Sequence, residues 1–177
     1  VLPSGKMSPT RTITVEKQAL APAKEVADVK PGLNMKMTYG YYLNVDELAK
    51  ATEWTEKTIE KLRDIRSQEP TWENMRGVKY YSAIATGYVE IPEDGVYYIS
   101  SENEEVWIDG KLLVNNGGEV KRFSRKDSSA ALAKGKHEIK VVFLSHIIGG
   151  WPSAWNDGSV KLRKADAEKF VSIKPEQ

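Results

Sequence analysis

The sequence predicts an all-β fold, namely an antiparallel β-sandwich or barrel with a short N-terminal arm and little helix. From Lys79 onward, apolar side chains recur at every second position within short segments, which is the period of a strand with one buried face. Turns that contain glycine separate these segments at even spacing, a pattern typical of antiparallel sandwiches and barrels. Segments with helical periodicity are scarce.

The longest predicted strand follows Lys79. One of its faces carries alternating apolar residues, namely Tyr81, Ala83, Ala85, Val89 and Ile91. Gly87 interrupts the strand, as a bulge or a close approach of another backbone would. Segment 92–95 (Pro-Glu-Asp-Gly) predicts a turn, because proline presets φ and glycine accepts a positive φ. A second strand is predicted over 96–101.

Two hairpins are predicted further along the chain. Asp109-Gly110 stands between two apolar segments and is the strongest short-range hairpin signal in the sequence. Lys134-Gly135 marks the second turn. The strands expected to pair across these turns are 106–108 with 112–114, and 128–133 with 137–145. Beyond a loop rich in glycine and tryptophan, apolar residues alternating with charge predict a last strand over 159–163.

Helix is predicted at one place. Asn44 is suited to cap a short helix over 45–50, which has acidic residues in its first turn. The segment Thr55–Arg66 fits neither the helical nor the strand period well, and we expect it to be irregular. The segment 167–173 is compatible with a closing turn of helix or with a final strand.

Length, charge and cysteine content exclude several classes of protein. The chain has 177 residues, enough for one ordinary domain plus an appendage and too few for an eight-unit catalytic barrel. Its 26 basic and 25 acidic side chains leave a net charge of +1, which gives no electrostatic reason to expect nucleic acid as a partner. No apolar run approaches the length of a membrane span, so we expect none. Without cysteine, disulfides, thiolate catalysis and cysteine-ligated metals are excluded.

Aromatic residues and prolines divide the chain near residue 30. Every aromatic side chain lies between Tyr39 and Phe170, whereas half of the eight prolines precede position 32. We therefore expect a main domain over 32–177 and a linker over 18–31. Residues 1–17 contain a short alternating pattern, which fits either an untethered terminus or the last strand of a preceding domain.

Three linked motifs carry a resemblance to a known family. They are Gly87–Tyr97 (GYVEIPEDGVY), Val106–Val114 (VWIDGKLLV) and Ala133–Ile139 (AKGKHEI). In this order and spacing they resemble the PA14 domain across roughly residues 32–165. The resemblance implies a β-barrel or β-sandwich module of secreted bacterial glycosidases, adhesins, flocculins and toxins, which often binds glycans.

Two further segments, Gly32–Lys36 and Ser4–Pro9, are similar to the tail of bacterial family 20 β-N-acetylhexosaminidases. In that family a small Ig-like domain follows the catalytic barrel and leads into PA14, so the resemblance implies that 1–17 is the last strand or remnant of an Ig-like domain. It further implies a non-catalytic accessory module of a secreted, periplasmic or cell-surface bacterial enzyme. Such a module would bind glycan or dock on the upstream catalytic domain of the same polypeptide.

Two alternatives to this function stay open. The first is a purely structural or protein-interaction module of an adhesin-like surface protein, and the second is a calcium-dependent lectin domain. In calcium-dependent members of the family, an Asp-Asp-Gly motif holds the ion, and the matching positions here are Ser101, Glu102 and Asn103. Calcium favours several oxygen ligands with more than one carboxylate among them. We therefore expect no calcium site, no other metal and no cofactor.

The loop 146–158 is the strongest candidate for a carbohydrate site. Its candidate residues are Trp151, Trp155, Asn156, Asp157 and His146. The two indoles can stack on the apolar face of a sugar while the polar groups form hydrogen bonds with its hydroxyls. Concave ligand-binding sites combine aromatic walls with a few polar groups in this way. An N-acetylglucosamine-containing glycan fits the family resemblance. The alternative is that both indoles close the end of the barrel or pack on a neighbouring domain, because tryptophan is usually well buried.

The remaining histidine, basic and acidic residues that could bind or react favour structural roles. His137 is in phase with the inward face of its strand, and we expect a hydrogen-bonded core residue. The run 121–126 is the only basic patch, and a solvated loop explains it more simply than an anionic glycan site. Asp46-Glu47 and Glu104-Glu105 are adjacent carboxylates of the kind that glycosidases use. For neither pair does the sequence indicate neighbouring residues that would support a catalytic role. We therefore expect no catalytic residue in this chain.

Overall fold

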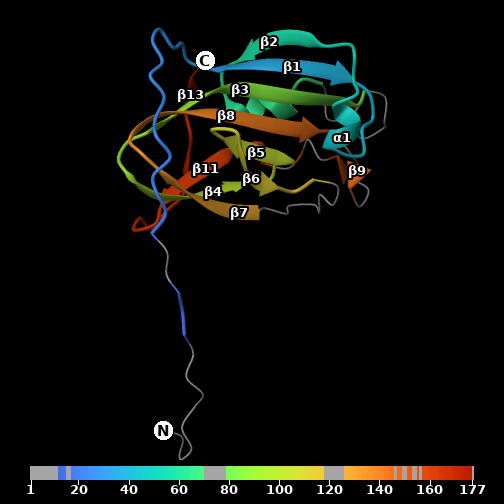
Figure 1. The fold of residues 1–177 in the computed structure, drawn as a ribbon. Coiled ribbons are helices and arrows are strands. Elements are labelled where there is room, and N and C mark those ends of the chain that lie inside the picture. The colour runs from blue at the N-terminus through green and yellow to red at the C-terminus, as the bar shows by residue number, and fades with distance from the viewer. Residues whose placement is uncertain are drawn as a thin grey trace, which may run out of the picture.

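The computed structural model describes residues 12–14, 17–69, 79–117, 126–145, 147–148, 151–152, 155 and 157–176. Within these residues the fold consists of two main antiparallel sheets stacked face to face (Figure 1). This architecture confirms the predicted all-β class with little helix. None of the helices in the described ranges is long and apolar enough to cross a membrane.

The larger sheet has the strand order β2-β1-β3-β8-β5-β6, with β13 paired to β3. Its strands are β1 (Leu33–Tyr39), β2 (Thr55–Ile59), β3 (Tyr81–Ile91), β5 (Glu105–Ile108), β6 (Lys111–Asn115), β8 (Gly135–Leu144) and β13 (Pro175–Glu176). The smaller sheet has the order β12-β11-β4-β7. Its strands are β4 (Gly95–Ser101), β7 (Lys126–Leu132), β11 (Val160–Lys164) and β12 (Val171–Ser172). A separate pair consists of β9 (Ile147–Ile148) and β10 (Trp151–Pro152).

The core fills the space between the two sheets. The inward face of β3 is buried at every position that the alternation predicts, from Tyr81 to Ile91. The Tyr81 ring packs on Phe143 of β8, with ring centroids 5.2 Å apart. From the smaller sheet, Ile99 and Val160 are completely buried in the same cluster. Because each fully buried side chain of this size contributes about 1.5–3 kcal/mol, this interior is the main source of stability.

One of the two predicted hairpins is present, namely the one that joins β5 to β6. Between β5 and β6, Asp109 has φ +48° and Gly110 has φ +76°, as expected for the two central residues of a type I′ turn. The second predicted hairpin was wrong: β7 pairs with β4 in the smaller sheet and β8 pairs with β3 and β5 in the larger sheet, so the turn at Lys134-Gly135 connects the two sheets. A local turn signal marks where a strand ends and does not specify which strand the next one pairs with. The predicted last strand is β11, and the ambiguous segment 167–173 contains β12, so a strand rather than a helix lies there.

The expectation that Thr55–Arg66 is irregular was wrong. Residues 55–59 form β2, which pairs with β1, and Leu62–Arg66 form a 3₁₀ helix, η1. β2 lies at the end of the strand order of its sheet, and its first four residues are exposed. An edge strand with polar residues on both faces has no apolar alternation to reveal it. Ile59 and Ile65 are both buried, but they belong to different elements.

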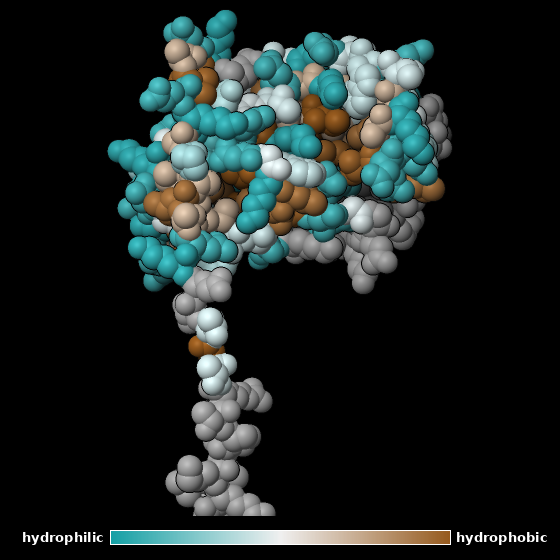
Figure 2. Space-filling view, viewed as in Figure 1, coloured by the Kyte–Doolittle hydropathy of each residue, from teal (hydrophilic) through white to brown (hydrophobic). Residues whose placement is uncertain are grey.

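The predicted short helix is α1 (Val45–Leu48), and Asn44 caps it by accepting a hydrogen bond from Glu47 N at 2.9 Å. The helix places Leu48 against Val142 and Leu144, which lie on the outer face of the larger sheet. Figure 2 shows a mostly hydrophilic surface with hydrophobic atoms visible between β3 and β8 beside α1. The segment around α1 therefore forms a second, smaller apolar cluster outside the main core.

Residues 17–31 contact the sandwich at the turn between β7 and β8. Ala21 pairs with Leu132, and Lys24 pairs with Lys136. The Lys24 ammonium also forms an ion pair with Glu138 at 2.6 Å. The division into 1–17, 18–31 and 32–177 stays a prediction, because most of the arm, including 1–11, lies outside the described residues.

Candidate functional site

The structure places two residues of the predicted carbohydrate site at the surface. Trp155 is 42% exposed, and Asp157 is also exposed two residues further on. Trp151 belongs to β10, but its side chain lies outside the described part of the structure. His146 and Asn156 lie entirely outside the described residues. Trp155 and Asp157 are therefore the part of the prediction on which a site can be built.

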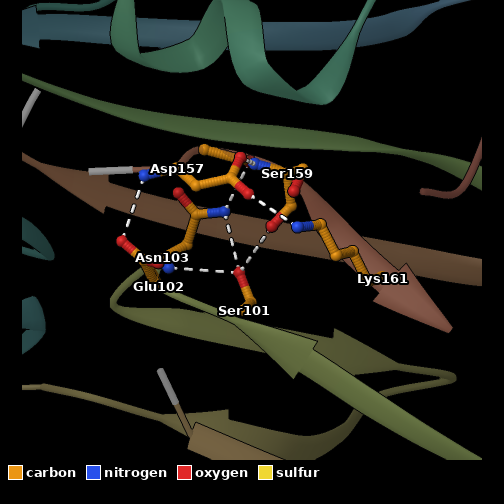
Figure 3. A network of polar contacts seen from close by, with 7 residues as sticks. Ser101, Glu102, Asn103, Asp157, Ser159 and Lys161 are labelled. Atoms are coloured by element: carbon orange, nitrogen blue, oxygen red, sulfur yellow. Dashed lines mark hydrogen bonds and ion pairs between the residues drawn. The ribbon is translucent and has the colours of Figure 1, made fainter. Parts of the chain in front are cut away.

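Glu102 and Asn103, which follow β4, hold the backbone of this loop (Figure 3). The Glu102 Oε2 atom accepts a hydrogen bond from Asp157 N at 3.0 Å. The Asn103 Nδ2 group donates to the Gly158 carbonyl at 2.9 Å. Both side chains are buried, so these bonds are shielded from competing water. They fix the backbone at Asp157 and Gly158.

Ser101 and Asn116 complete this network. Ser101 Oγ donates to the Ser159 carbonyl at 3.2 Å and accepts from Asn103 Nδ2 at 3.0 Å. The Asn116 amide donates to the carbonyls of Ser101 and Asn103, at 3.1 and 2.7 Å. Because these residues come from segments far apart in sequence, the network ties the end of β4, the end of β6 and the start of β11 together.

Asp157 presents an ionised carboxylate at the surface of the loop. Burial alone would raise its pKa, but hydrogen bonds from Ser159 and Lys161 outweigh burial and hold the pKa at about 2. The Lys161 ammonium lies 3.0 Å from Asp157 Oδ2, and Ser159 N donates to Oδ1 at 2.9 Å. The carboxylate is thus a fixed hydrogen-bond acceptor two positions after the exposed Trp155.

Arg66 enters the same region from η1 and is buried, with 3% of its surface exposed. Its Nε donates to Asn103 Oδ1 at 3.0 Å, and its Nη2 donates to the Glu102 carbonyl at 2.6 Å. The guanidinium carbon lies 4.7 Å from the centroid of the Phe143 ring. Burial lowers the pKa of Arg66, whereas the carboxylates of Glu104 and Glu102 raise it. An arginine keeps its charge in such an environment, so a permanent cation stands among buried acidic groups.

The residues at the degenerate calcium positions do not fit a calcium ion. Asn103 Oδ1 and the Glu102 carbonyl already accept from Arg66, and Glu102 Oε2 accepts from Asp157 N. The oxygens that would have to ligate the ion thus face a guanidinium and a backbone amide. No cluster of three histidine or carboxylate side chains suited to a metal occurs in the described ranges.

Sequence reasoning missed Arg66, Glu104 and Asn116 as members of this network. Arg66 reaches partners that are 36 and 37 positions further along the chain. Glu104, which adjoins β5, is fully buried, and its Oε2 accepts from Leu144 N at 2.9 Å. No spacing or composition signal in the sequence pairs these positions, because the contacts join residues that are far apart in the chain and meet only in the folded structure.

His137 is a hydrogen-bonded core residue, as predicted. It is completely buried. Its Nδ1 lies 2.5 Å from Asp109 Oδ2, and its Nε2 lies 2.8 Å from the Ala133 carbonyl. Asp109 Oδ1 also accepts from Glu138 N at 2.9 Å. The histidine therefore links the β5–β6 hairpin turn to the turn between β7 and β8, at the end of the sandwich where β8 begins.

The adjacent carboxylates also have structural hydrogen bonds. Glu47 Oε2 accepts from Leu43 N at 2.8 Å at the start of α1. Glu105 Oε2 accepts from the Trp107 indole at 2.7 Å. In the basic run, residues 121–125 lie outside the described part of the chain, and Lys126 begins β7.

Comparison with known proteins identifies relatives for most of the chain. The family model of the PA14 domain matches residues 30–171. A β-hexosaminidase of Porphyromonas gingivalis (strain ATCC BAA-308 / W83) is 44% identical over 173 residues, which cover 98% of this chain and 22% of the relative. The chain therefore spans about a fifth of the length of that relative.

Solved structures with little sequence identity share the fold. The PA14 domain of the antifreeze protein MpAFP has a TM-score of 0.56 at 12% identity, over 87% of this chain and 94% of that domain. A β-glucosidase from Kluyveromyces marxianus, solved with glucose, has a TM-score of 0.50 at 18% identity, over 85% of this chain and 19% of the enzyme. With the stacked antiparallel sheets and the match of the family model to most of its length, this chain belongs to the PA14 domain family.

Proposed function

We propose that this chain is a non-catalytic, carbohydrate-binding accessory module of a glycoside hydrolase of the β-N-acetylhexosaminidase type. The relative that is 44% identical is a β-hexosaminidase, and this chain corresponds to 22% of it. A module of this size leaves the rest of such an enzyme to carry the chemistry. The acidic pairs described above are engaged in structural hydrogen bonds, which supports a role in binding rather than in hydrolysis.

The observation that carries this proposal is the exposed Trp155 two positions before the ionised Asp157 in the same loop. The indole offers an apolar face for stacking on a sugar ring, and the carboxylate accepts hydrogen bonds from hydroxyl groups. Glu102 holds the backbone at Asp157 by accepting a hydrogen bond from its amide. A loop that is already held in place loses little conformational entropy when it binds a ligand.

N-acetylglucosamine-containing glycans are the ligands that we propose, because a β-hexosaminidase relative suggests them. The catalytic domain of the same polypeptide is the proposed partner in the intact enzyme. Binding to a polymeric glycan would keep that domain close to its substrate and raise its effective concentration there. Such a role belongs outside the cytoplasm, in a secreted, periplasmic or cell-surface bacterial protein.

Tryptophan fluorescence with N-acetylglucosamine oligomers tests this proposal. We expect a saturable change in emission for the unaltered chain and its loss in Trp155→Ala. Phe170→Ala is a matched control, because Phe170 is 37% exposed and lies beside Arg163 near the far end of β11; it should titrate like the unaltered chain. Equal responses in all three proteins, or no response in any, would contradict carbohydrate binding through Trp155.

A docking module is the second candidate, and a specific surface favours it. The ring centroids of Tyr98 and Phe170 lie 4.6 and 5.3 Å from the guanidinium carbon of Arg163. Val96 and Val171 are also exposed, by 42% and 63%. These side chains belong to or adjoin the smaller sheet. Docking through them predicts that an enzyme with Val171→Asp and Tyr98→Ser loses interdomain contacts in crosslinking while glycan binding persists.

A further inference from the structure

We propose that the guanidinium of Arg66 is a resident cation that organises the end of β4 and the loop at 157–159, so that this end of the sandwich needs no calcium ion. This role of Arg66 does not depend on glycan binding. Arg66 is a positioning residue, because it acts on the loop through Glu102 and Asn103.

The guanidinium binds the turn after β4 at two points. It donates from Nε to the Asn103 side-chain oxygen at 3.0 Å and from Nη2 to the Glu102 carbonyl at 2.6 Å. These two acceptors belong to consecutive residues, so the planar fork of the arginine fixes their relative orientation. The Phe143 ring, 4.7 Å away, covers the cation within the core.

The charges around Arg66 require a cation. Glu104 is completely buried and Glu102 is 9% exposed. Their carboxylates are the acidic groups that act most strongly on Arg66. Removing one partner of a buried charge cluster leaves the others uncompensated in a medium of low dielectric constant, which is strongly unfavourable. Arg66 is therefore the counter-charge that allows two glutamates to lie inside this end of the fold.

The orientation that Arg66 imposes is passed on to the loop. Because the Asn103 oxygen faces the guanidinium, its amide nitrogen faces the Gly158 carbonyl, 2.9 Å away. Gly158 also packs directly on η1, since a Cβ atom there would lie 3.0 Å from Arg66 Cδ and 3.1 Å from the Arg63 backbone. The loop residues that follow Trp155 are thus held against both the turn and the 3₁₀ helix.

A divalent ion would have to use the same oxygens that the guanidinium now occupies. Both cations would compete for the Glu102 carbonyl, the Asn103 amide oxygen and the buried carboxylates. Calcium prefers several oxygen ligands including carboxylates, and such a set becomes open only when the arginine side chain is removed. The loop should therefore be independent of calcium in the unaltered chain and become responsive to small cations when Arg66 is truncated.

The experiment compares the unaltered chain with Arg66→Ala, Arg66→Lys and the control Arg63→Ala, which removes an exposed arginine from the same helix. Thermal midpoints are measured with a chelator, with millimolar calcium chloride and with millimolar methylguanidinium chloride. Trp155 emission is obtained as the difference between each protein and its Trp155→Phe counterpart. We expect the unaltered chain and Arg63→Ala to be insensitive to all three additions.

Arg66→Ala should lower the thermal midpoint by about 10 °C and shift the Trp155 emission to longer wavelength. Adding calcium or methylguanidinium to this variant should partly reverse both changes. Arg66→Lys keeps the positive charge but lacks the planar guanidinium with its several donors, so we expect an intermediate thermal midpoint. If Arg66→Ala does not fold, Arg66→Lys is the variant used for the test. Calcium stabilising the unaltered chain would overturn the proposal. So would a loss in Arg66→Ala that neither cation reverses, or a midpoint for Arg66→Lys equal to that of the unaltered chain.

Discussion

Replacing Asn103 by alanine should destabilise the fold far more than the loss of one polar side chain usually does. Asn103 is completely buried. Its amide accepts from Arg66 at 3.0 Å and donates to Ser101 and Gly158, at 3.0 and 2.9 Å. A hydrogen bond with a charged partner contributes about 1.5–3 kcal/mol and a neutral one about 0.5–1.5 kcal/mol. The three bonds together predict a loss of about 4 kcal/mol in the free energy of unfolding.

Urea unfolding followed by far-ultraviolet circular dichroism measures this loss. Asn115→Ala is the matched control, because Asn115 is exposed and its side chain accepts from Gly117 N at 2.8 Å. We expect the control to lose less than about 1 kcal/mol. The reasoning is refuted if Asn103→Ala loses no more than the control, because the buried network would then contribute nothing to stability.

Two further predictions concern other parts of the fold. The pKa of Asp157 is about 2 in the folded chain against an ordinary value of 3.8, so its ionised form stabilises the fold above pH 4 and this contribution is lost as the pH falls toward 2. Its carboxylate is about 40% exposed, so solvent screening limits the contribution to about 1 kcal/mol. In urea unfolding, the unaltered chain should therefore have a larger free energy of unfolding than Asp157→Asn at neutral pH, and this difference should vanish by pH 2. A difference that stays constant with pH would contradict this prediction. Gly32→Ala should lower the free energy of unfolding by at least about 2 kcal/mol more than Gly110→Ala does. A Cβ atom at Gly32 would lie 2.6 Å from the Ile59 carbonyl, whereas a Cβ atom at Gly110 would meet nothing within 4 Å. Both glycines have positive φ, so equal losses would show that the steric contact at Gly32 is unimportant.

The elements that the sequence predicted correctly are those with local signals. The alternation along β3 and the Asp109-Gly110 turn each depend on neighbouring residues, so period and turn chemistry reveal them. β2 was missed because its first four residues are exposed and carry no alternation. Such an edge strand is stabilised by its pairing with β1, which no local pattern encodes.

The candidate site was predicted only in part, for a similar reason. The exposed indole of Trp155 and its acidic neighbour were visible as a loop composition. The buried support below them was not, because Arg66 meets Asn103 only after η1 packs against the end of β4. The family resemblance indicated that Ser101, Glu102 and Asn103 are poor calcium ligands, and the structure adds that they bind an arginine and the loop backbone instead.

The buried network that holds Asp157 and Gly158 has a functional consequence. Binding sites are effective when the groups that contact the ligand are held by a surrounding network. Here Glu102 binds Asp157 N, and Asn103 binds the Gly158 carbonyl. Weakening the network through Asn103→Ala should therefore reduce glycan affinity without altering any group that touches the sugar.

The most direct test of the proposed function is a nuclear magnetic resonance titration of the unaltered chain with N-acetylglucosamine oligomers. The chain contains five tryptophans, and nitrogen-15 labelling resolves their indole N–H resonances. We predict that the Trp155 resonance shifts saturably at millimolar ligand, while those of Trp54 and Trp107, whose indoles donate to Ala51 and Glu105, stay in place. A spectrum in which the Trp155 resonance does not move, or moves no more than those of Trp54 and Trp107, would contradict carbohydrate binding at this loop.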